Sequence, residues 1–225
     1  MLEGQVVVGR DTGRGRDRGD QAGPETAPSN WNLPNALTTL RILMVPFFGW
    51  ALLVDDGQSI LWRCVAWALF VAAMITDKID GDIARSRNLV TNFGKIADPI
   101  ADKALTGMAF VGLSIVGDLW WWVTALVLVR EWGITLLRLW VIRHGVMAAG
   151  RGGKLKTVLQ TVALGFFILP IKILQDDWGV AGDILWGISV LLMAAAVTVT
   201  VVTGADYVVK ALAVRREGRA TVGNR

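Results

Sequence analysis

The sequence predicts an all-α, polytopic membrane protein with six transmembrane helices and both chain ends on the cytoplasmic side. The 225-residue chain is 53% hydrophobic and only 19% charged, whereas about a quarter of the residues in a soluble domain are charged. Several of its apolar runs are long enough to cross a bilayer, which takes about 20 residues. We therefore expect the lipid bilayer to surround most of the chain.

The charges of the connecting segments predict the orientation. Basic and acidic segments alternate, and cytoplasmic loops of membrane proteins carry an excess of Lys and Arg. The protein is thus expected in the cell membrane, with its basic segments and the active site on the cytoplasmic side. The net charge of +4 reflects this topology and indicates no nucleic-acid partner. The basic set comprises the N-terminal arginines, Lys78, Arg85, Arg87, Lys95, Arg143, Arg151, Lys154, Lys156, Lys210, Arg215, Arg216 and Arg219; the acidic set comprises Asp55, Asp56, Asp118, Asp176, Asp177 and Asp183.

One membrane domain is expected between two polar tails. Residues 1–30 are rich in Gly, Arg and Asp and show no hydrophobic periodicity, which predicts a disordered tail. The membrane domain is expected over residues 31–210, and a basic cytoplasmic tail over residues 211–225. A chain of this length suits one compact bundle.

Six apolar segments are predicted as the membrane helices. Asn35 is predicted as the N-cap of the first, since an Asn side chain accepts a hydrogen bond from the first helical turn, and Pro34 restricts the entry. The third helix reaches membrane length only if it begins near Ala97, inside an aspartate-rich segment. The glycine-rich segment 143–156 is predicted as a loop. The helices are expected at about 35–54, 60–76, 97–116, 120–142, 157–174 and 184–205.

The aspartate-rich segment 77–102 carries the candidate chemistry. It reads DKIDGDIARSRNLVTNFGKIADPIAD. An α-helix turns 100° per residue, so Asp77 and Asp80 share one face. Asp98 and Asp102 are four residues apart and share another. The residues between the two pairs suffice for a turn, so two helical segments joined by a hairpin are expected to present all four carboxylates to one point.

Four carboxylates that face one another repel unless a cation is bound. Hard oxygen ligands favour Mg²⁺ or Mn²⁺, and two such ions can bridge phosphate oxygens, activate an attacking oxygen and stabilise a leaving one. A site for two divalent ions is therefore predicted. The alternative is that the carboxylates are boundary charges paired with Lys78, Lys95 and Lys103, and the two matched faces argue against it.

The neighbours of the first Asp pair suggest what the site binds. Gly81 and Ala84 lie on the same helix face and remove side-chain bulk, which permits close approach by a base or a ribose. Arg85 is suited to pair with a phosphate. Together they indicate a nucleotide diphosphate as the bound group.

The complete pattern resembles the signature of the CDP-alcohol phosphotransferase family. Eight motif positions match: Asp77-x-x-Asp80-Gly81-x-x-Ala84-Arg85, then eight residues, then Gly94-x-x-x-Asp98-x-x-x-Asp102. The resemblance implies a six-helix membrane enzyme, often a homodimer. Such an enzyme moves a phosphatidyl or similar group from a CDP-linked donor to an alcohol and releases CMP. It also implies roles for the motif residues: Asp77, Asp80, Asp98 and Asp102 hold two metals, Asp102 is also the general base on the acceptor hydroxyl, and Gly81, Ala84, Arg85 and Gly94 contact the CDP-linked donor.

A wider similarity covers most of residues 31–210 and points to the branch of the family that uses glycerol 3-phosphate as its acceptor and CDP-diacylglycerol as its donor. In that branch Asn35 and Thr38 are expected to contact the donor, although both also suit ordinary helix capping. Arg41, which belongs to the same stretch, also suits a residue that snorkels to the membrane boundary. The similar stretches are 32–35, 37–38 with Arg41, 94–103, 130–131 with Arg138, and 153–157 with Gln160.

Four basic residues, Arg130, Arg138, Lys154 and Lys156, are expected to bind the phosphate of this acceptor. Arg130 and Arg138 lie eight residues apart, which places them about 80° apart around a helix. An unpaired Arg in a membrane run is costly, and pairing with Glu131 is the structural alternative. For the two lysines, the alternative is solvation or contact with anionic lipid.

Other functions are separable by simple observations. Within the family, the acceptor is alternatively an inositol phosphate, or phosphatidylglycerol as in a cardiolipin synthase. A membrane prenyltransferase also uses aspartates and metals, but its motifs lie in distant segments, whereas both pairs here fall in one short stretch. A transporter would move its substrate without releasing CMP.

Overall fold

The computed structural model describes residues 32–86, 91–141 and 152–222. Over these ranges the chain contains helices and no strands, so the predicted all-α class is confirmed. The elements are α1 (Leu33–Leu53), the short 3₁₀ helix η1 (Val54–Gly57), α2 (Ile60–Ser86), α3 (Asn92–Ile115), α4 (Trp121–Val141), α5 (Gly152–Ile168), α6 (Gln175–Trp178) and α7 (Val180–Val222).

Three helical segments are long and apolar enough to cross a membrane: Leu33–Gly57, Ile60–Ala84 and Val180–Lys210, while Leu155–Ile168 is a shorter apolar helix. Large apolar side chains also remain on the outside of the protein. Phe47, Leu61 and Leu191 are each more than 60% exposed. A surface of this kind suits contact with lipid, which agrees with a membrane protein.

The start of α1 differs from the prediction. Asn32, and not Asn35, is the N-cap, because the Asn32 side chain accepts the backbone N–H of Asn35 at 3.0 Å. Pro34 then lies in the first turn, where a missing N–H leaves no hydrogen bond unmade. Asn35 is thereby inside the helix, and its buried side chain faces other elements.

The aspartate-rich segment forms two consecutive helices, as predicted. The first Asp pair lies near the end of α2 and the second pair lies in α3. Helix α3 begins at Asn92, earlier than the predicted Ala97, because Thr91 caps it by accepting the N–H of Gly94 at 3.0 Å.

The second half of the chain contains two further differences. Helix α5 begins at Gly152, so the end of the predicted loop 143–156 is helical, and the helix stops at Ile168, two residues before Pro170. Proline disfavours helical geometry in the residue before it. Helix α7 is longer than expected and its backbone continues to Val222.

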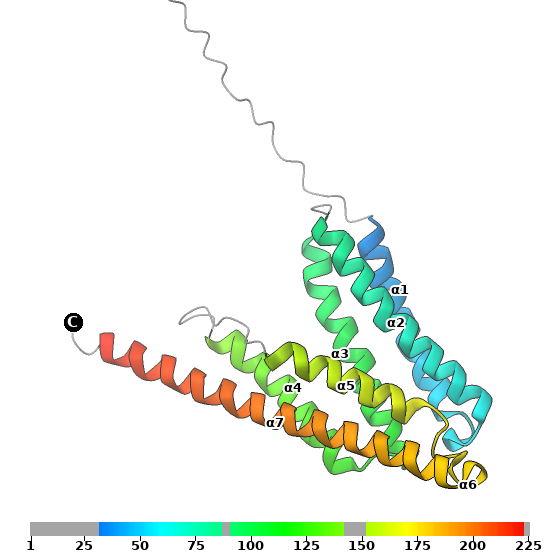
Figure 1. Ribbon diagram of the computed structural model, residues 1–225. Coiled ribbons are helices and arrows are strands. Elements are labelled where there is room, and N and C mark those ends of the chain that lie inside the picture. Colours follow the sequence, from blue (N-terminus) through cyan, green and yellow to red (C-terminus); the bar gives the residue numbers. More distant parts are fainter. Residues whose placement is uncertain (1–31, 87–90, 142–151, 223–225) are drawn as a thin grey trace, which may run out of the picture.

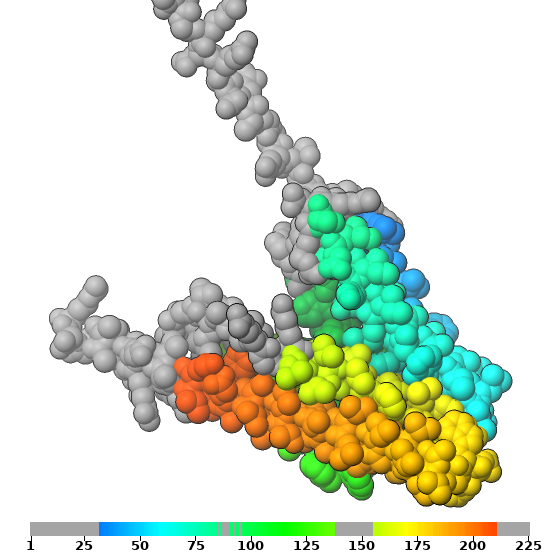
Figure 2. Space-filling view, in the orientation of Figure 1, coloured from blue at the N-terminus to red at the C-terminus, as the bar shows by residue number. Residues whose placement is uncertain are grey.

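The helices form two groups that share one core (Figure 1). Helix α1 packs against α2 and α3, while α7 packs against α5 and α4. In Figure 2 the orange α7 lies along the yellow-green α5. Phe48, Phe70 and Phe110 from the first group and Leu164 and Phe167 from α5 are fully buried in the common core.

Glycines bring α1 and α3 close together. A Cβ atom on Gly112 would lie 2.6 Å from a methyl carbon of Leu52, and one on Gly49 would lie 2.7 Å from the sulfur of Met108. Small residues of this kind allow close helix packing inside membranes. The close approach also brings the polar N-terminal half of α1 against the aspartates of α3.

Candidate active site

Two side chains of α1 connect the aspartates of α2 and α3. Thr38 and Arg41 lie three residues apart on one face of α1, and both are 1% exposed. The Thr38 hydroxyl lies 2.6 Å from Asp98 Oδ1 and 3.5 Å from Asp80 Oδ2. One hydroxyl oxygen therefore lies within reach of carboxylates from both predicted pairs.

Arg41 is the counter-ion of the first Asp pair. Its guanidinium donates to the carboxylates of both Asp77 and Asp80. Asp80 is 3% exposed, so this ion pair lies inside the protein, whereas Asp77 is 42% exposed. Among the described residues, Asp77 and Asp80 form ion pairs with Arg41. The alternative that Lys78 or Lys103 neutralises them is therefore not what the structure contains.

Lys103 has different partners. Its ammonium lies 2.5 Å from the hydroxyl of Thr135 and 5.1 Å from the centre of the Trp132 ring. This lysine therefore links α3 to α4. The side chain of Lys95 lies outside the described residues.

Asp102 lies one helical turn beyond Asp98 on α3. Its carboxylate interacts electrostatically with Asp77, Lys156, Glu131 and Arg41. It forms no ion pair within the described part of the chain. Charged residues of α1, α2, α4 and α5 therefore all act on the Asp102 carboxylate.

The carboxylates suit a divalent cation in their chemistry. Oxygen atoms are the ligands that Mg²⁺ and Mn²⁺ prefer. One guanidinium supplies one positive charge to a group of four carboxylates, which leaves an excess of negative charge that a cation can offset. No group of three or more His, Cys, Asp or Glu side chains in the described ranges converges closely enough to hold a metal ion as the side chains stand. In this conformation Arg41 balances part of the charge.

A second buried polar group lies beside the aspartates. Thr91 donates through Oγ1 to Asn35 Oδ1 at 2.9 Å and accepts the N–H of Gly94 at 3.0 Å. A Cβ on Gly94 would lie 3.1 Å from Asn35 Oδ1 and 3.9 Å from Asp98 Oδ2. Gly94 therefore allows α1 to approach the start of α3 and the carboxylate of Asp98.

The remaining predicted donor-contact residues lie at the end of α2. Gly81 and Ala84 are half-buried on the helix that carries the first Asp pair. The side chain of Arg85 lies outside the described residues.

Two of the four predicted acceptor residues come together around Glu131. Arg130 donates to Glu131 Oε1 at 2.9 Å, and Lys156 is ion-paired with the same oxygen. Lys156 is 7% exposed and belongs to helix α5, so the alternative of a solvated loop lysine does not describe it. The side chains of Arg138 and Lys154 lie outside the described residues.

Sequence reasoning did not assign a site role to three residues that the structure brings to this region. Arg41 carried a detectable signal, since Asn35, Thr38 and Arg41 recur every three residues on one helix face. Thr91 carried a weaker one as a capping residue before Gly94. Thr203, which lies 2.9 Å from Arg130 Nη2, carried none, because its contact depends on how α7 packs.

Apolar membrane-length helices, with aspartates of α2 and α3 joined by Thr38 and Arg41 of α1, define a membrane protein with a carboxylate-rich polar region. The chain belongs to the CDP-alcohol phosphatidyltransferase family, whose model matches residues 31–202. The family predicted from the aspartate motif is thereby confirmed.

Among curated proteins, the chain is similar to several relatives in bacteria. It is 52% identical over 181 residues to a probable phosphatidylglycerophosphate synthase of Mycobacterium tuberculosis (strain ATCC 25618 / H37Rv), an alignment that covers 80% of this chain and 82% of the relative. It is 36% identical over 190 residues to a CDP-diacylglycerol–glycerol-3-phosphate 3-phosphatidyltransferase of Bacillus subtilis (strain 168), with 79% and 93% covered. A protein of Escherichia coli (strain K12) with the same name is 36% identical over 160 residues, with 67% and 84% covered.

Proposed function

We propose that this protein transfers the phosphatidyl group of CDP-diacylglycerol to the 1-hydroxyl of sn-glycerol 3-phosphate, giving phosphatidylglycerophosphate and CMP. The observation that carries this proposal is a pair of cations held by Glu131, one of which interacts electrostatically with Asp102. Arg130 and Lys156 share Glu131, and Lys156 interacts electrostatically with Asp102. A phosphate held by these cations lies next to a carboxylate that can accept a proton. The names of the curated relatives agree with this reaction.

Asp102 is the proposed general base. It removes the proton from the 1-hydroxyl of glycerol 3-phosphate while that oxygen attacks the phosphorus that carries the diacylglycerol. A new phosphorus–oxygen bond forms, the bond to the CMP oxygen breaks, and CMP leaves. The absence of an ion-pair partner for Asp102 in the described ranges supports this role, since no Lys or Arg side chain there neutralises its carboxylate.

Asp77, Asp80, Asp98 and Asp102 are proposed to hold two divalent ions, Mg²⁺ or Mn²⁺. When bound, such ions offset the charge of the diphosphate and of the leaving CMP. The donor set and its excess of negative charge support the assignment. Arg41 already provides one cation to Asp77 and Asp80.

The donor is proposed to bind along the polar ends of α1, α2 and the start of α3. Asn35 and Gly94 are held together there by Thr91, and Thr38 contacts Asp98. Gly81 and Ala84 offer little side-chain bulk beside the first Asp pair, and Arg85 is the proposed partner of a phosphate. The diacyl chains extend into the bilayer along the apolar surface of the helices.

The membrane arrangement is also a proposal in its finer features. Helices α3, α4 and α5 are proposed to cross the bilayer together with the three membrane-length segments. The alternation of loop charges supports both termini and the active site facing the cytoplasm of the cell membrane. A homodimer is proposed from the family resemblance. For Arg138 and Lys154, a role at the acceptor phosphate remains a proposal from the sequence.

A CMP-release assay tests the function. Purified protein is supplied with CDP-diacylglycerol, Mg²⁺ or Mn²⁺, and one acceptor at a time: glycerol 3-phosphate, inositol phosphate, phosphatidylglycerol or serine. We expect CMP release with glycerol 3-phosphate and formation of phosphatidylglycerophosphate. Release with inositol phosphate or phosphatidylglycerol, but not with glycerol 3-phosphate, would overturn the acceptor and leave the family reaction in place.

A further inference from the structure

We propose that Thr203 and Gly204 on α7 are positioning residues that hold Arg130 in the conformation that binds the acceptor phosphate. The inference rests on the proposed function, because it assigns glycerol 3-phosphate to Arg130 and Lys156. It adds a contribution from α7, which carries none of the motif residues and packs against α4 and α5.

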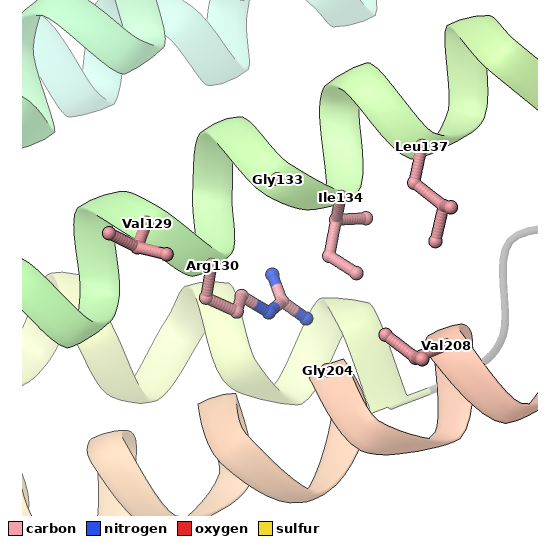
Figure 3. A pocket seen from close by; sticks show the side chains of 7 residues that line it. All are labelled: Val129, Arg130, Gly133, Ile134, Leu137, Gly204 and Val208. Atoms are coloured by element: carbon pink, nitrogen blue, oxygen red, sulfur yellow. The ribbon is translucent and has the colours of Figure 1, made fainter.

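The first observation is how the Arg130 guanidinium is held. The side chain extends from α4 toward α7, over Gly204 (Figure 3). Nη2 donates to Thr203 Oγ1 at 2.9 Å, and Nη1 donates to Glu131 Oε1 at 2.9 Å. Thr203 is suited to accept, since its own hydroxyl proton is directed to the carbonyl of Val199 at 2.7 Å. The two hydrogen bonds fix both ends of the guanidinium.

The second observation is the space that Gly204 leaves. A Cβ at this position would lie 3.2 Å from Cγ and 3.5 Å from Nε of Arg130. The missing side chain is therefore what allows the Arg130 stem to lie flat against α7. An alanine at this position requires the arginine stem to move by a few tenths of an ångström, because the alternative is to move the helix backbone.

The third observation is the apolar surroundings of the same arginine. A cavity of about 280 Å³ lies between α4 and α7, with Arg130 as its charged member (Figure 3). The other lining residues are Val129, Gly133, Ile134, Leu137, Gly204 and Val208. They offer no polar side chain to the guanidinium, and Arg130 Nε is buried without a hydrogen-bond partner in the described part of the chain. If the Thr203 hydroxyl is removed, no other side chain that lines this cavity can accept a hydrogen bond from the Arg130 guanidinium.

The contacts transmit this positioning to Lys156. Glu131 is shared between Arg130 and Lys156, so one negative charge is divided between two cations and a net positive charge remains for a phosphate. If Arg130 leaves its position against α7, its contact with Glu131 is weakened as well. Glu131 then neutralises Lys156 more completely. The acceptor loses both a correctly placed arginine and part of the charge on the lysine.

The test compares two substitutions with matched controls in the full-length protein. Thr203→Val removes the hydroxyl and keeps the shape, and Gly204→Ala adds the one atom that meets Arg130. Thr198→Val is the control for the first, because the Thr198 hydroxyl makes the same contact to a carbonyl one turn back, 2.8 Å to Ala194, and is exposed on α7. Gly187→Ala is the control for the second, since a Cβ there meets nothing within 4 Å.

The readout is the KM for each substrate and kcat, measured by CMP release. For Thr203→Val and Gly204→Ala we expect the KM for glycerol 3-phosphate to rise about threefold to tenfold, a part of the effect of one hydrogen bond to a charged group. The KM for CDP-diacylglycerol and kcat at saturating acceptor stay close to wild type. Thr203→Ser, which keeps the hydroxyl, restores the wild-type KM. Both control variants behave as wild type.

Three outcomes distinguish this inference from the proposed function. If Arg130→Gln and Lys156→Met raise the KM for glycerol 3-phosphate but Thr203→Val and Gly204→Ala do not, the contribution of α7 is wrong and the acceptor site stands. If Arg130→Gln leaves that KM unchanged, the acceptor assignment and the inference both fail. If the α7 variants raise the KM for both substrates alike, or only lower the melting temperature, their role is structural and the inference is overturned.

Discussion

Arg41 on α1 and Asp80 on α2 form an ion pair in which both side chains are at least 97% buried. The same guanidinium also binds Asp77. When one partner of a buried ion pair is lost, the other charge remains in the protein interior without compensation, and the protein is strongly destabilised. The pair therefore links the first two helices at the point where the candidate active site lies.

Replacement of Arg41 is expected to destabilise the protein and to make it dependent on divalent ions. In Arg41→Met, Asp80 is left buried without its counter-ion, which costs about 3–5 kcal/mol when a buried pair is broken. We expect a lower melting temperature in detergent and a larger rise on addition of Mg²⁺ than the wild type shows. The matched control is Lys210→Met, which breaks the exposed pair with Asp206 and is expected to change neither value. A normal melting temperature in Arg41→Met without Mg²⁺ would contradict the structural role of the pair.

Asp102→Asn is expected to abolish turnover in a folded protein. The change removes the proposed base and keeps the size of the side chain, so kcat should fall about 10²- to 10⁴-fold, the usual contribution of a general base. CDP-diacylglycerol binding, measured with the labelled lipid, should remain. Asp82→Asn on α2 is the control, since Asp82 is exposed and lies off the face that carries the motif. Near-normal kcat in Asp102→Asn would exclude Asp102 as the base.

Removal of divalent ions is expected to stop the reaction reversibly. Treatment with EDTA should eliminate CMP release, and Mg²⁺ or Mn²⁺ should restore it, because the carboxylates of α2 and α3 need cations to bind a diphosphate. In Asp98→Asn, a higher Mg²⁺ concentration should be required for half-maximal activity. Binding of Mn²⁺, followed by its electron paramagnetic resonance signal, should weaken in parallel. Full activity in EDTA would argue against a metal-dependent reaction.

Arg63→Met is expected to reduce stability without a change in either KM. Arg63 is fully buried, is ion-paired with Asp118 and donates to the carbonyl of Phe167 at 3.1 Å. Lys172 also reaches Asp118, at 3.0 Å. Arg63 precedes Asp80 by seventeen residues of α2, about 25 Å along a helix. The contacts of Arg63, Asp118 and Lys172 therefore stabilise the end of the bundle that lies far from the aspartates.

The measurement for Arg63→Met is the melting temperature together with the KM for both substrates. Loss of one partner of this buried pair should lower stability by about 3–5 kcal/mol. Lys172→Met, whose side chain is 40% exposed, is the milder comparison and should lower it less. A rise in the KM for glycerol 3-phosphate alone in Arg63→Met would show that this end of the bundle affects the acceptor site.

Much of the fold followed from the chain itself, because hydrophobicity and local periodicity are local properties. The apolar runs predicted helices, and the spacing of the aspartates predicted two consecutive helical segments. The boundaries were less accurate. The sequence predicts Asn35 as the N-cap, whereas Asn32 provides it, and α5 begins inside a segment that is predicted as a loop. The start of α5 is rich in glycine and positive charge, which in a sequence is typical of a loop. The helix nevertheless begins there, because the residues that follow pack against the rest of the protein.

The sequence by itself determined the family and the motif, since Asp77, Asp80, Gly81, Ala84, Arg85, Gly94, Asp98 and Asp102 have a spacing that can be read directly. The tertiary structure decided which side chains from distant segments meet these residues. It brought Arg41 to Asp77 and Asp80, and Thr203 on α7 to Arg130 on α4. Residues separated by 36, 39 and 73 positions have no periodic relation to one another. Their contacts arise only when the helices pack, and a buried charge then takes the partner that the packed neighbour offers.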